Sequence, residues 1–352
     1  MRQEGVYMKK IGVNAICMCV TEDGIWFVQG MCPILYFYDI KINEITKAEA
    51  MQIGESYGEG FFSQIYNLEN KLYLVPNNSK KIVIYSIYNN TFEYIDVLDS
   101  SYNMYINCYE LNEYLYFIPY RAKKMIKLSI TDKNDIEYID MDYNEREDNC
   151  INSTCRNGNI VYGALWGKNE IIEIDLDTLQ IKFIKINYDY EFSQIEKYRN
   201  LFYLYDMKNK KIIVFSENFD KIVSEKYVGY RICNFKIKKD GSIILNSGET
   251  NDVIFINSDF ERVKKIEISK YTDFIDVGKY QFNVWEEYKD VMLGIGKNGI
   301  LYKYYNFNEK IEKQDIKINK KMYNQLNTII IRNSNVVKER KTYKLASFLK
   351  NI

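Results

Sequence analysis

Residues 62–86 read FSQIYNLENKLYLVPNNSKKIVIYS, and this stretch recurs without a gap at residues 192–216 as FSQIEKYRNLFYLYDMKNKKIIVFS. Eleven of the 25 positions are identical, and six of the other 14 exchange one apolar residue for another. A third copy, LYFIPYRAKKMIKLSI at residues 115–130, lies 43 residues after the matching part of the first copy. Since the first two copies are 130 residues apart, about three times 43, the sequence predicts a repeat of about 43 residues.

The composition favours a large β-sheet protein. Of 352 residues, 47% are hydrophobic, which is enough for a core without disulfides or metals. The chain has 33 tyrosines and only three prolines, and aromatic and β-branched residues suit a half-buried pleated surface. No apolar run reaches the roughly 18 residues that a membrane span requires. We interpret residues 11–20 as a first strand rather than a signal peptide.

The chain contains no histidine, which excludes His general-base catalysis and every zinc site that needs imidazole. Seven cysteines are an odd number, and their spacing is not that of a disulfide framework. We therefore expect a reduced, cytoplasmic setting, with no metal and no other cofactor.

Charge is distributed unevenly although the formal net charge is zero. Residues 317–352 contain nine basic residues and one acidic residue, so the preceding part of the chain is acidic. We expect residues 1–318 to form the repeat domain. Residues 319–352 are expected to form a basic C-terminal tail, either a short amphipathic helix or a strap on the domain.

Each repeat reads as four short strands separated by turns. Second strands are predicted to start near Ile25, Leu72, Leu115, Ile160, Leu201, Ile243 and Val291. Third strands are predicted to close at Asp39, Ser86, Ser129, Asp175, Ser216, Asn257 and Tyr304. All but the last of these closing residues have side chains that initiate tight turns by bonding the following backbone. Four strands per unit of this length are typical of propeller blades rather than helical solenoids.

These patterns resemble the β-propeller superfamily in its kelch, WD40 and YVTN-like branches, most clearly at residues 160–186, IVYGALWGKNEIIEIDLDTLQIKFIKI. The resemblance covers about residues 11–318, but the Gly-Gly pair of kelch and the Trp-Asp of WD40 are missing, so it indicates no subfamily. It implies an all-β, seven-bladed β-propeller of four-stranded antiparallel blades. Residues 11–20 would be the innermost strand of blade 1, and residues 311–318 the outermost strand of blade 7.

The same resemblance implies that the loops from fourth to first strands and from second to third strands share one partner-binding face. A tyrosine lies in six inter-blade loops, and two tryptophans are further candidates for this rim: Tyr57, Tyr102, Tyr143, Tyr188, Tyr230, Tyr271, Trp166 and Trp285. An acidic mouth is predicted from Glu55, Glu59, Asp142, Glu145, Asp189 and Glu191. Alternatively, the tyrosines pack between blades and the acids form an ordinary solvated surface.

Three other patterns have simpler interpretations. Pairs of lysines begin three of the third strands and blunt strand ends. Residues 294–299 read GIGKNG, but a strand pattern follows rather than a helix, which predicts a hairpin turn and not a nucleotide site. Five cysteines fall on predicted first strands (Cys17, Cys19, Cys108, Cys155 and Cys233), where they act as small hydrophobic residues.

The function that these observations favour is a non-enzymatic interaction module, a scaffold or adaptor, that binds a protein or peptide through the loop face. An acidic mouth would suit a basic partner, and we hypothesise that the chain's own tail docks there or competes with the partner. No nucleic-acid partner is expected. Two alternatives stay open: a carboxylate-based hydrolase or lyase acting on a glycan-like substrate, and a sugar-binding module. No catalytic residue is singled out.

Overall fold

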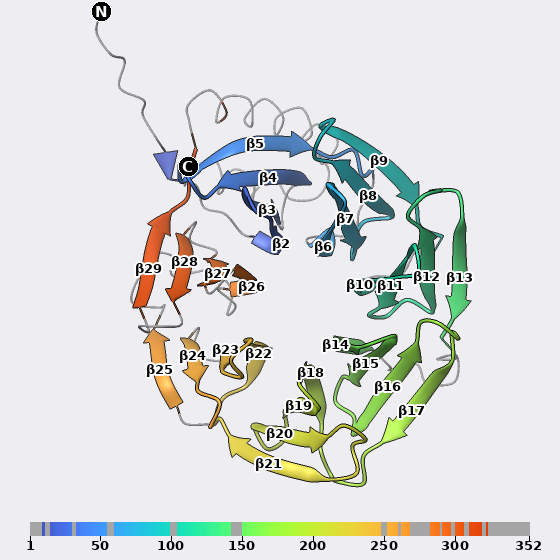
Figure 1. The fold of residues 1–352 in the computed structure, drawn as a ribbon, viewed down its shortest axis with the longest axis vertical. Coiled ribbons are helices and arrows are strands. Elements are labelled where there is room, and N and C mark those ends of the chain that lie inside the picture. The colour runs from blue at the N-terminus through green and yellow to red at the C-terminus, as the bar shows by residue number, and fades with distance from the viewer. Residues whose placement is uncertain are drawn as a thin grey trace, which may run out of the picture. The chain divides into compact units, whose positions relative to one another are not determined.

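The structure is a computed structural model that describes residues 9–10, 15–29, 33–54, 60–98, 104–141, 150–247, 252–259, 262–267, 282–288, 291–296, 300–305, 310–318 and 322. The described strands form seven β-sheets, one for each predicted repeat (Figure 1). The fold is a seven-bladed β-propeller, as the sequence predicts. In the described residues, no helix has the length and hydropathy that crossing a membrane requires.

Blades 1 to 4 each contain four antiparallel strands that are neighbours in chain order; blade 1 has two further strands, described below. Blade 1 contains β2 (Ala15–Val20), β3 (Gly24–Gln29), β4 (Ile34–Asp39) and β5 (Glu44–Ala50). Blade 2 contains β6 (Phe62–Leu68), β7 (Lys71–Pro76), β8 (Lys81–Ser86) and β9 (Thr91–Asp96). Blade 3 contains β10 (Tyr105–Leu111), β11 (Tyr114–Pro119), β12 (Lys124–Ser129) and β13 (Ile136–Asp140). Blade 4 contains β14 (Ile151–Asn157), β15 (Ile160–Leu165), β16 (Glu170–Asp175) and β17 (Ile181–Lys185).

Blades 5 to 7 follow the same order. Blade 5 contains β18 (Phe192–Tyr198), β19 (Leu201–Asp206), β20 (Lys211–Ser216) and β21 (Ile222–Tyr227). Blade 6 contains β22 (Ile232–Ile237), β23 (Ile243–Ser247), β24 (Asp252–Ile256) and β25 (Arg262–Glu267). Blade 7 contains β26 (Phe282–Tyr288), β27 (Val291–Gly296), β28 (Ile300–Tyr305) and β29 (Lys310–Asp315). Every predicted second strand starts within one residue of its observed position.

Five of the six predicted turns after third strands are held by the expected side chains. The carboxylates of Asp39 and Asp175 each accept a hydrogen bond from the backbone N–H two residues on, at 2.8 and 2.9 Å. The hydroxyls of Ser86, Ser129 and Ser216 accept backbone N–H groups three to five residues on. The residues 294–296 end β27, and strand β28 pairs with it antiparallel, which confirms the hairpin interpretation of the glycine-rich stretch.

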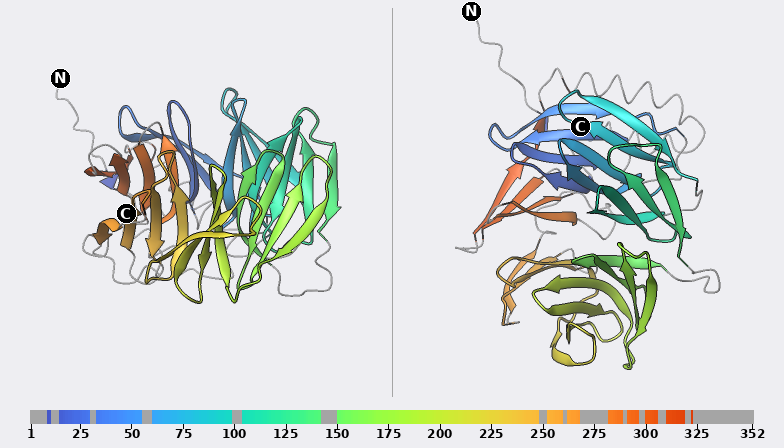
Figure 2. Two further views of the ribbon diagram at one scale, coloured as in Figure 1. Left: turned by 60° about the horizontal axis from the view of Figure 1, so that its bottom comes forward. Right: turned by 45° about the vertical axis from the view of Figure 1, so that its right-hand side comes forward.

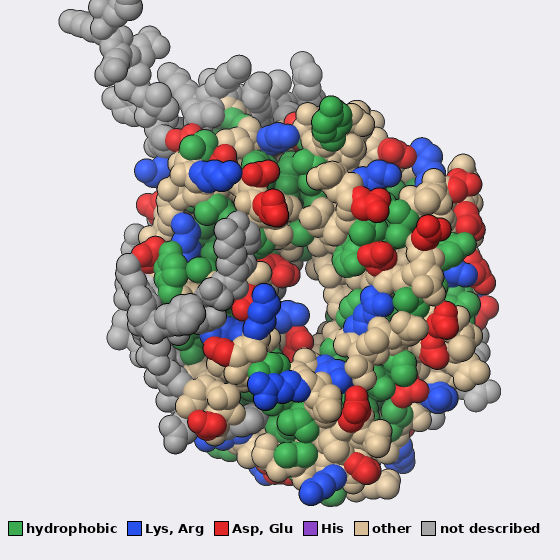
Figure 3. Space-filling view, viewed as in Figure 1, with side chains coloured by type: hydrophobic (Ala, Val, Ile, Leu, Met, Phe, Trp, Pro, Cys, Tyr) green, Lys and Arg blue, Asp and Glu red, His purple; other side chains and the backbone are tan. Residues whose placement is uncertain are grey.

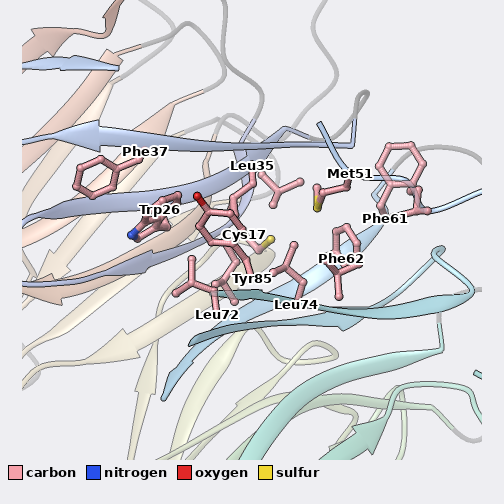
Figure 4. Packing of buried hydrophobic residues seen from close by; sticks show 14 residues of the cluster. Cys17, Trp26, Leu35, Phe37, Met51, Phe61, Phe62, Leu72, Leu74 and Tyr85 are labelled. Carbon is pink, nitrogen blue, oxygen red and sulfur yellow. The ribbon is translucent and has the colours of Figure 1, made fainter. Parts of the chain in front are cut away.

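The chain divides into two compact units. The first contains blade 1, most of blade 2 and blade 7, and the second contains blades 3 to 6. In the first unit, Trp26 of blade 1 packs 4.7 Å from Phe37 and 5.2 Å from Tyr85 of blade 2, between ring centroids. Leu72 and Leu74 of blade 2 complete this apolar layer between neighbouring sheets (Figure 4). Burial of such aromatic surface is the main driving force for stacking the blades.

In the second unit, a separate apolar cluster fills each space between successive blades. Blades 4 and 5 enclose Tyr162, Phe202 and Phe219, with Phe202 and Phe219 stacked at 4.4 Å. Figure 2 shows the four sheets of this unit, in green to orange, as twisted antiparallel ribbons. The interior is therefore built from interfaces between sheets, each repeated from one blade to the next.

One strand prediction is wrong in part. The outermost strand of blade 7 is β29, which ends at Asp315, whereas β30 (Lys317–Ile318) pairs in parallel with β5 of blade 1. A further short strand, β1 (Lys9–Lys10), pairs antiparallel with β30 and extends blade 1 to six strands. The reason is hydrophobic: Ile316 and Ile318 are fully buried in the cluster that contains Ile45 of β5. The predicted tail, residues 319–352, lies outside the described residues apart from Met322, which packs against this cluster.

Candidate functional site

Four segments of the second unit, all connections of the two kinds predicted to share one face, are joined by hydrogen bonds. They are residues 166–169, 186–191, 206–210 and 228–231, here called the loop platform. The Asn169 side-chain amide donates to the carbonyls of Ile186 and Tyr188, at 3.0 and 3.1 Å. The backbone N–H of Gly167 donates to the carbonyl of Phe192 at 2.9 Å. The first two segments are thereby held as one piece.

Asp206, the last residue of β19, connects the second segment to the third. Its carboxylate is fully buried and accepts hydrogen bonds from the backbone N–H groups of Glu191 (2.9 Å), Lys208 (3.1 Å) and Asn209 (3.3 Å). The Asn209 side-chain amide donates a fourth bond at 2.6 Å. Because a buried carboxylate needs its oxygens satisfied, these four donors fix both segments around it.

Two large aromatic side chains are exposed on the platform, Trp166 at 37% and Tyr188 at 47%. Tyr190 stacks on Tyr188 with ring centroids 5.5 Å apart and an interplanar angle of 25°. The Tyr190 hydroxyl donates to Glu225 of β21 at 2.8 Å. Burial and the bond to this carboxylate raise the pKa of Tyr190, so its hydroxyl stays protonated as the donor. Tyr188 therefore stacks on the ring of Tyr190, which the hydrogen bond to Glu225 holds in place.

Charges of both signs surround these rings. Lys208 pairs with the exposed Asp189, and Lys211 lies 2.8 Å from Glu225. The hydrogen bonds from Lys211 and from Tyr190 lower the pKa of Glu225, which is therefore ionised at neutral pH. Acidic and basic side chains are also interspersed over the face of the molecule drawn in Figure 3. The described part of the platform is mixed in charge rather than purely acidic.

Part of the predicted rim lies on this platform. Trp166, Tyr188, Asp189 and Glu191 are exposed there. Tyr230 is partly buried; its carbonyl accepts the Tyr205 hydroxyl at 2.7 Å and its ring lies 5.8 Å from Lys265 Nζ.

The other predicted rim residues are not on described loops. Trp285 lies within β26, the innermost strand of blade 7, and not in a loop. The remaining predicted rim and mouth residues fall outside the described residues: Tyr57, Tyr102, Tyr143, Tyr271, Glu55, Glu59, Asp142 and Glu145.

Sequence reasoning missed Asp206, although the repeat carries a signal for it. At the same place in the repeat, blades 2 and 3 have Pro76 and Pro119, each the last residue of its second strand. A buried carboxylate in place of a proline is stable only if N–H groups donate hydrogen bonds to it, and the adjacent loops supply these donors.

Sequence reasoning also missed Glu225, which lies on a strand and not in a loop. The equivalent residues of blades 2 and 3 are Tyr94 and Tyr138, whose hydroxyls accept the backbone N–H groups of Gln52 (2.9 Å) and Leu98 (3.4 Å). In both blades the outer-strand tyrosine therefore bonds the loop that leaves the preceding blade. In blade 5 this place is taken by a carboxylate that bonds Tyr190 and Lys211 instead.

The innermost strands of the second unit carry polar side chains that bridge neighbouring blades. Thr154 of blade 4 bonds the Tyr109 hydroxyl of blade 3 at 2.9 Å. The Ser153 hydroxyl donates to the carbonyl of Ile195 in blade 5 at 3.1 Å. Lys236 of blade 6 pairs with Glu196 of blade 5 at 2.9 Å. These polar groups bond one another across the blade interfaces, so we assign them a role in stabilising the fold rather than in binding or catalysis.

The five cysteines predicted on first strands lie there, Cys150 directly precedes β14, and all six described cysteines are free thiols. Burial raises the pKa of Cys108 and Cys155 well above the usual thiol value, so both remain protonated and unreactive. In the described residues, no group of three or more His, Cys, Asp or Glu side chains is placed to hold a metal ion.

No family model matches the chain, and no curated protein matches it. Several solved structures do match the chain. Virginiamycin B lyase from Staphylococcus aureus superposes with a TM-score of 0.66 at 10% identity, over 85% of this chain and 98% of that one. A catalytically inactive variant of that lyase, with a histidine replaced by alanine and with quinupristin, gives the same TM-score and identity.

Two further solved structures have the same fold. A chain of a mitotic checkpoint complex gives a TM-score of 0.59 at 11% identity, over 89% of each chain. Kluyveromyces lactis Hsv2 gives 0.53 at 10% identity, over 85% of this chain and 97% of that one. At these identities the likeness shows the propeller fold and nothing finer.

Proposed function

We propose that this protein is a non-enzymatic interaction module that binds a protein or peptide partner through the loop platform. The observation that carries the proposal is the pair of exposed aromatic rings, Trp166 and Tyr188, on a backbone fixed by Asn169 and Asp206. Exposed aromatic anchors that are already rigid lose little conformational entropy when a partner covers them.

The chemistry around the two rings supports a peptide or protein partner. Interfaces between proteins are enriched in Trp and Tyr at their centre and carry a polar rim of mixed charge. The platform has this composition, with the Asp189–Lys208 pair beside Tyr188. A nucleic-acid partner would favour a predominantly basic surface, and the chain has equal numbers of basic and acidic residues.

The lyase neighbours do not make a lyase the better proposal. The inactive variant of virginiamycin B lyase lacks one histidine, and this chain contains none at all. Chemistry that depends on a histidine is therefore not open to it. The checkpoint-complex neighbour supports the proposal to the extent that the same fold serves in a protein assembly.

The test is affinity capture from the native cell with the unaltered protein and with Trp166→Ala/Tyr188→Ala. Because aromatic anchors contribute about 2 kcal/mol or more, we expect at least about 30-fold weaker binding of the captured partner, measured by calorimetry. Tyr88→Ala is the matched control, since Tyr88 is 88% exposed in the turn between β8 and β9. Equal capture by all three proteins would refute the proposal.

Two further experiments test a sugar ligand and a role for residues 319–352. Binding to a panel of oligosaccharides that is lost in the double variant would replace the peptide partner by a sugar. Deleting residues 319–352 tests whether the tail competes for the site: partner affinity and its dependence on salt should both change if it does.

A further inference from the structure

The outer edge of blade 5 is the feature with no function assigned so far. It is formed by β21, which pairs with β20 and, in the described part of the chain, with no other strand. Every second side chain of β21 is exposed: Val223 at 51%, Glu225, and Tyr227 at 66%. A free strand edge that displays apolar side chains is a template for pairing with another chain.

The corresponding edges of blades 3 and 4 carry charges at their exposed positions. On β13 these are Glu137 and Asp140, and on β17 they are Lys182 and Lys185. Charged residues on an edge strand oppose the addition of a further strand. Of the outer strands β9, β13, β17 and β21, only β21 exposes large hydrophobic residues.

Blade 1 shows how an outer edge of this propeller is filled. Strand β30 adds to the outside of β5, with Lys317 opposite Glu44 and Ile318 opposite Ile45. An acidic–apolar edge is thus covered by a basic–apolar segment. The edge of β21 offers the same two properties, an acid flanked by apolar residues, although this acid, Glu225, already bonds Lys211 and Tyr190 within the blade.

From Ser224 to Tyr227 the backbone of β21 is oriented for such an addition, and Val223 is the extra residue of an irregularity in the ladder. The N–H of Val228 donates to the carbonyl of Lys210, and Lys226 lies opposite Ile212 in the ladder. Since hydrogen-bonded pairs alternate along an antiparallel ladder, the backbone groups of Glu225 and Tyr227 point away from β20 toward the open edge.

We propose that β21 accepts an extended segment of a protein partner as a fifth strand of blade 5. The segment places a Lys or Arg opposite Glu225, an apolar side chain opposite Tyr227 and a second apolar side chain against Val223 at the ladder irregularity. The inference rests on the proposed function, because Glu225 also bonds Tyr190 and so joins this edge to the loop platform. One partner then covers both surfaces.

Charge argues against a second copy of this chain as the occupant. Antiparallel pairing of two β21 strands with Val223 opposite Tyr227 would place Glu225 opposite Glu225. Like charges directly opposite each other destabilise a strand pair. A basic residue from a different chain removes that repulsion and matches the Lys317–Glu44 pairing of blade 1.

The probe is a fluorescein-labelled synthetic peptide, Thr-Val-Thr-Lys-Thr-Val-Thr, with its lysine replaced by glutamate as the control peptide. We expect anisotropy titration to show binding of the lysine peptide and weaker binding of the glutamate peptide. N-methylation of the valine and lysine amides, which would face β21, should weaken binding by about tenfold or more. N-methylation of the inner threonines should leave it unchanged. On binding, hydrogen exchange at Glu225 and Tyr227 should slow.

Variants of the protein test the same edge. Val223→Lys/Tyr227→Lys should weaken peptide binding by about tenfold or more, whereas Tyr88→Lys should not. Glu225→Gln keeps an acceptor for Tyr190 and removes the charge, so the lysine and glutamate peptides should bind this variant alike.

Three results would overturn the inference: no binding of the lysine peptide, equal binding of both N-methylated forms, or no effect of the two lysine substitutions. A dimer in sedimentation that these substitutions dissociate would overturn it in favour of a second copy. The outcome is separable from that of the proposed function. If Trp166→Ala/Tyr188→Ala leaves cellular capture unchanged while peptide binding depends on β21, the platform proposal fails and the edge proposal stands.

Discussion

Residues 62–86 and 192–216 form the same three strands of two different blades, β6–β8 of blade 2 and β18–β20 of blade 5. Phe62 and Phe192 each begin an innermost strand and are almost fully buried. The two stretches differ most where the second strand ends: Pro76 in one and Asp206 in the other. In blade 5 that single carboxylate holds two loops, and blade 2 has no carboxylate at this position.

The comparison separates two kinds of position in a repeat. Apolar positions that are identical, such as Phe62 and Phe192, are buried in the core of their blades. Positions at the loop end can change without altering the sheet, so a binding surface can be built there on one blade alone. Each of the following experiments tests one side of this division.

The largest effect is expected at the shared phenylalanines. Phe62→Ala and Phe192→Ala should each lower the free energy of unfolding by about 3–5 kcal/mol, because each removes a buried ring and leaves a cavity. Urea denaturation monitored by circular dichroism measures both losses. Phe→Leu at the same sites should cost less. A loss under about 1 kcal/mol at either site would show that the two blades are not packed alike.

An intermediate effect is expected at the position that differs. Asp206→Pro, which installs the residue of blade 2, should lower the free energy of unfolding by about 2–3 kcal/mol. It leaves the N–H groups of Glu191 and Lys208 without their acceptor, and partner binding at the platform should fall as well. Pro76→Ala is the control and should cost under about 1 kcal/mol. Full stability of the Asp206 variant would mean that the loops do not depend on this carboxylate.

The smallest effect is expected at Ser63 and Ser193, which occupy the same place in the two repeats. Among the described residues neither hydroxyl has a hydrogen-bond partner, and both are buried. Alanine at either position should therefore leave stability unchanged or raise it by up to about 1 kcal/mol. Ser153→Ala should instead lower it by about 1 kcal/mol, since that hydroxyl bonds Ile195. Thermal unfolding of the three variants distinguishes these outcomes.

The sequence was sufficient to predict the blades because each repeat unit encodes its own strands locally. Alternating apolar residues recur from blade to blade, and a turn-forming Asp or Ser, as at Asp39 and Asp175, closes the third strand in blades 1 to 5. The position of β30 was missed because it depends on a contact between distant parts of the chain. A strand of two residues has no periodicity of its own, and its partner β5 lies near the opposite end of the sequence.

The site was predictable only in part. Loop position and residue type were enough to select Trp166 and Tyr188. Loop position could not identify Asp206, because Asp206 is the last residue of a strand. Its role depends on N–H donors from two separate loops. Glu225 likewise acts through Tyr190, a residue from the preceding inter-blade loop. Comparing the repeats position by position would have identified Asp206, since it replaces the proline of blades 2 and 3. Glu225 becomes equivalent to Tyr94 only through the register shift of β21, which the structure reveals.

The pairing of Lys317–Ile318 with Glu44–Ile45 has a consequence for how the protein is made. Blade 1 is synthesised first, but the strand that covers its outer edge leaves the ribosome after all seven blades. Until then, the edge of β5 is open to any other extended chain nearby. A nascent chain stalled before residue 317 should therefore be the species most prone to aggregate and to bind chaperones.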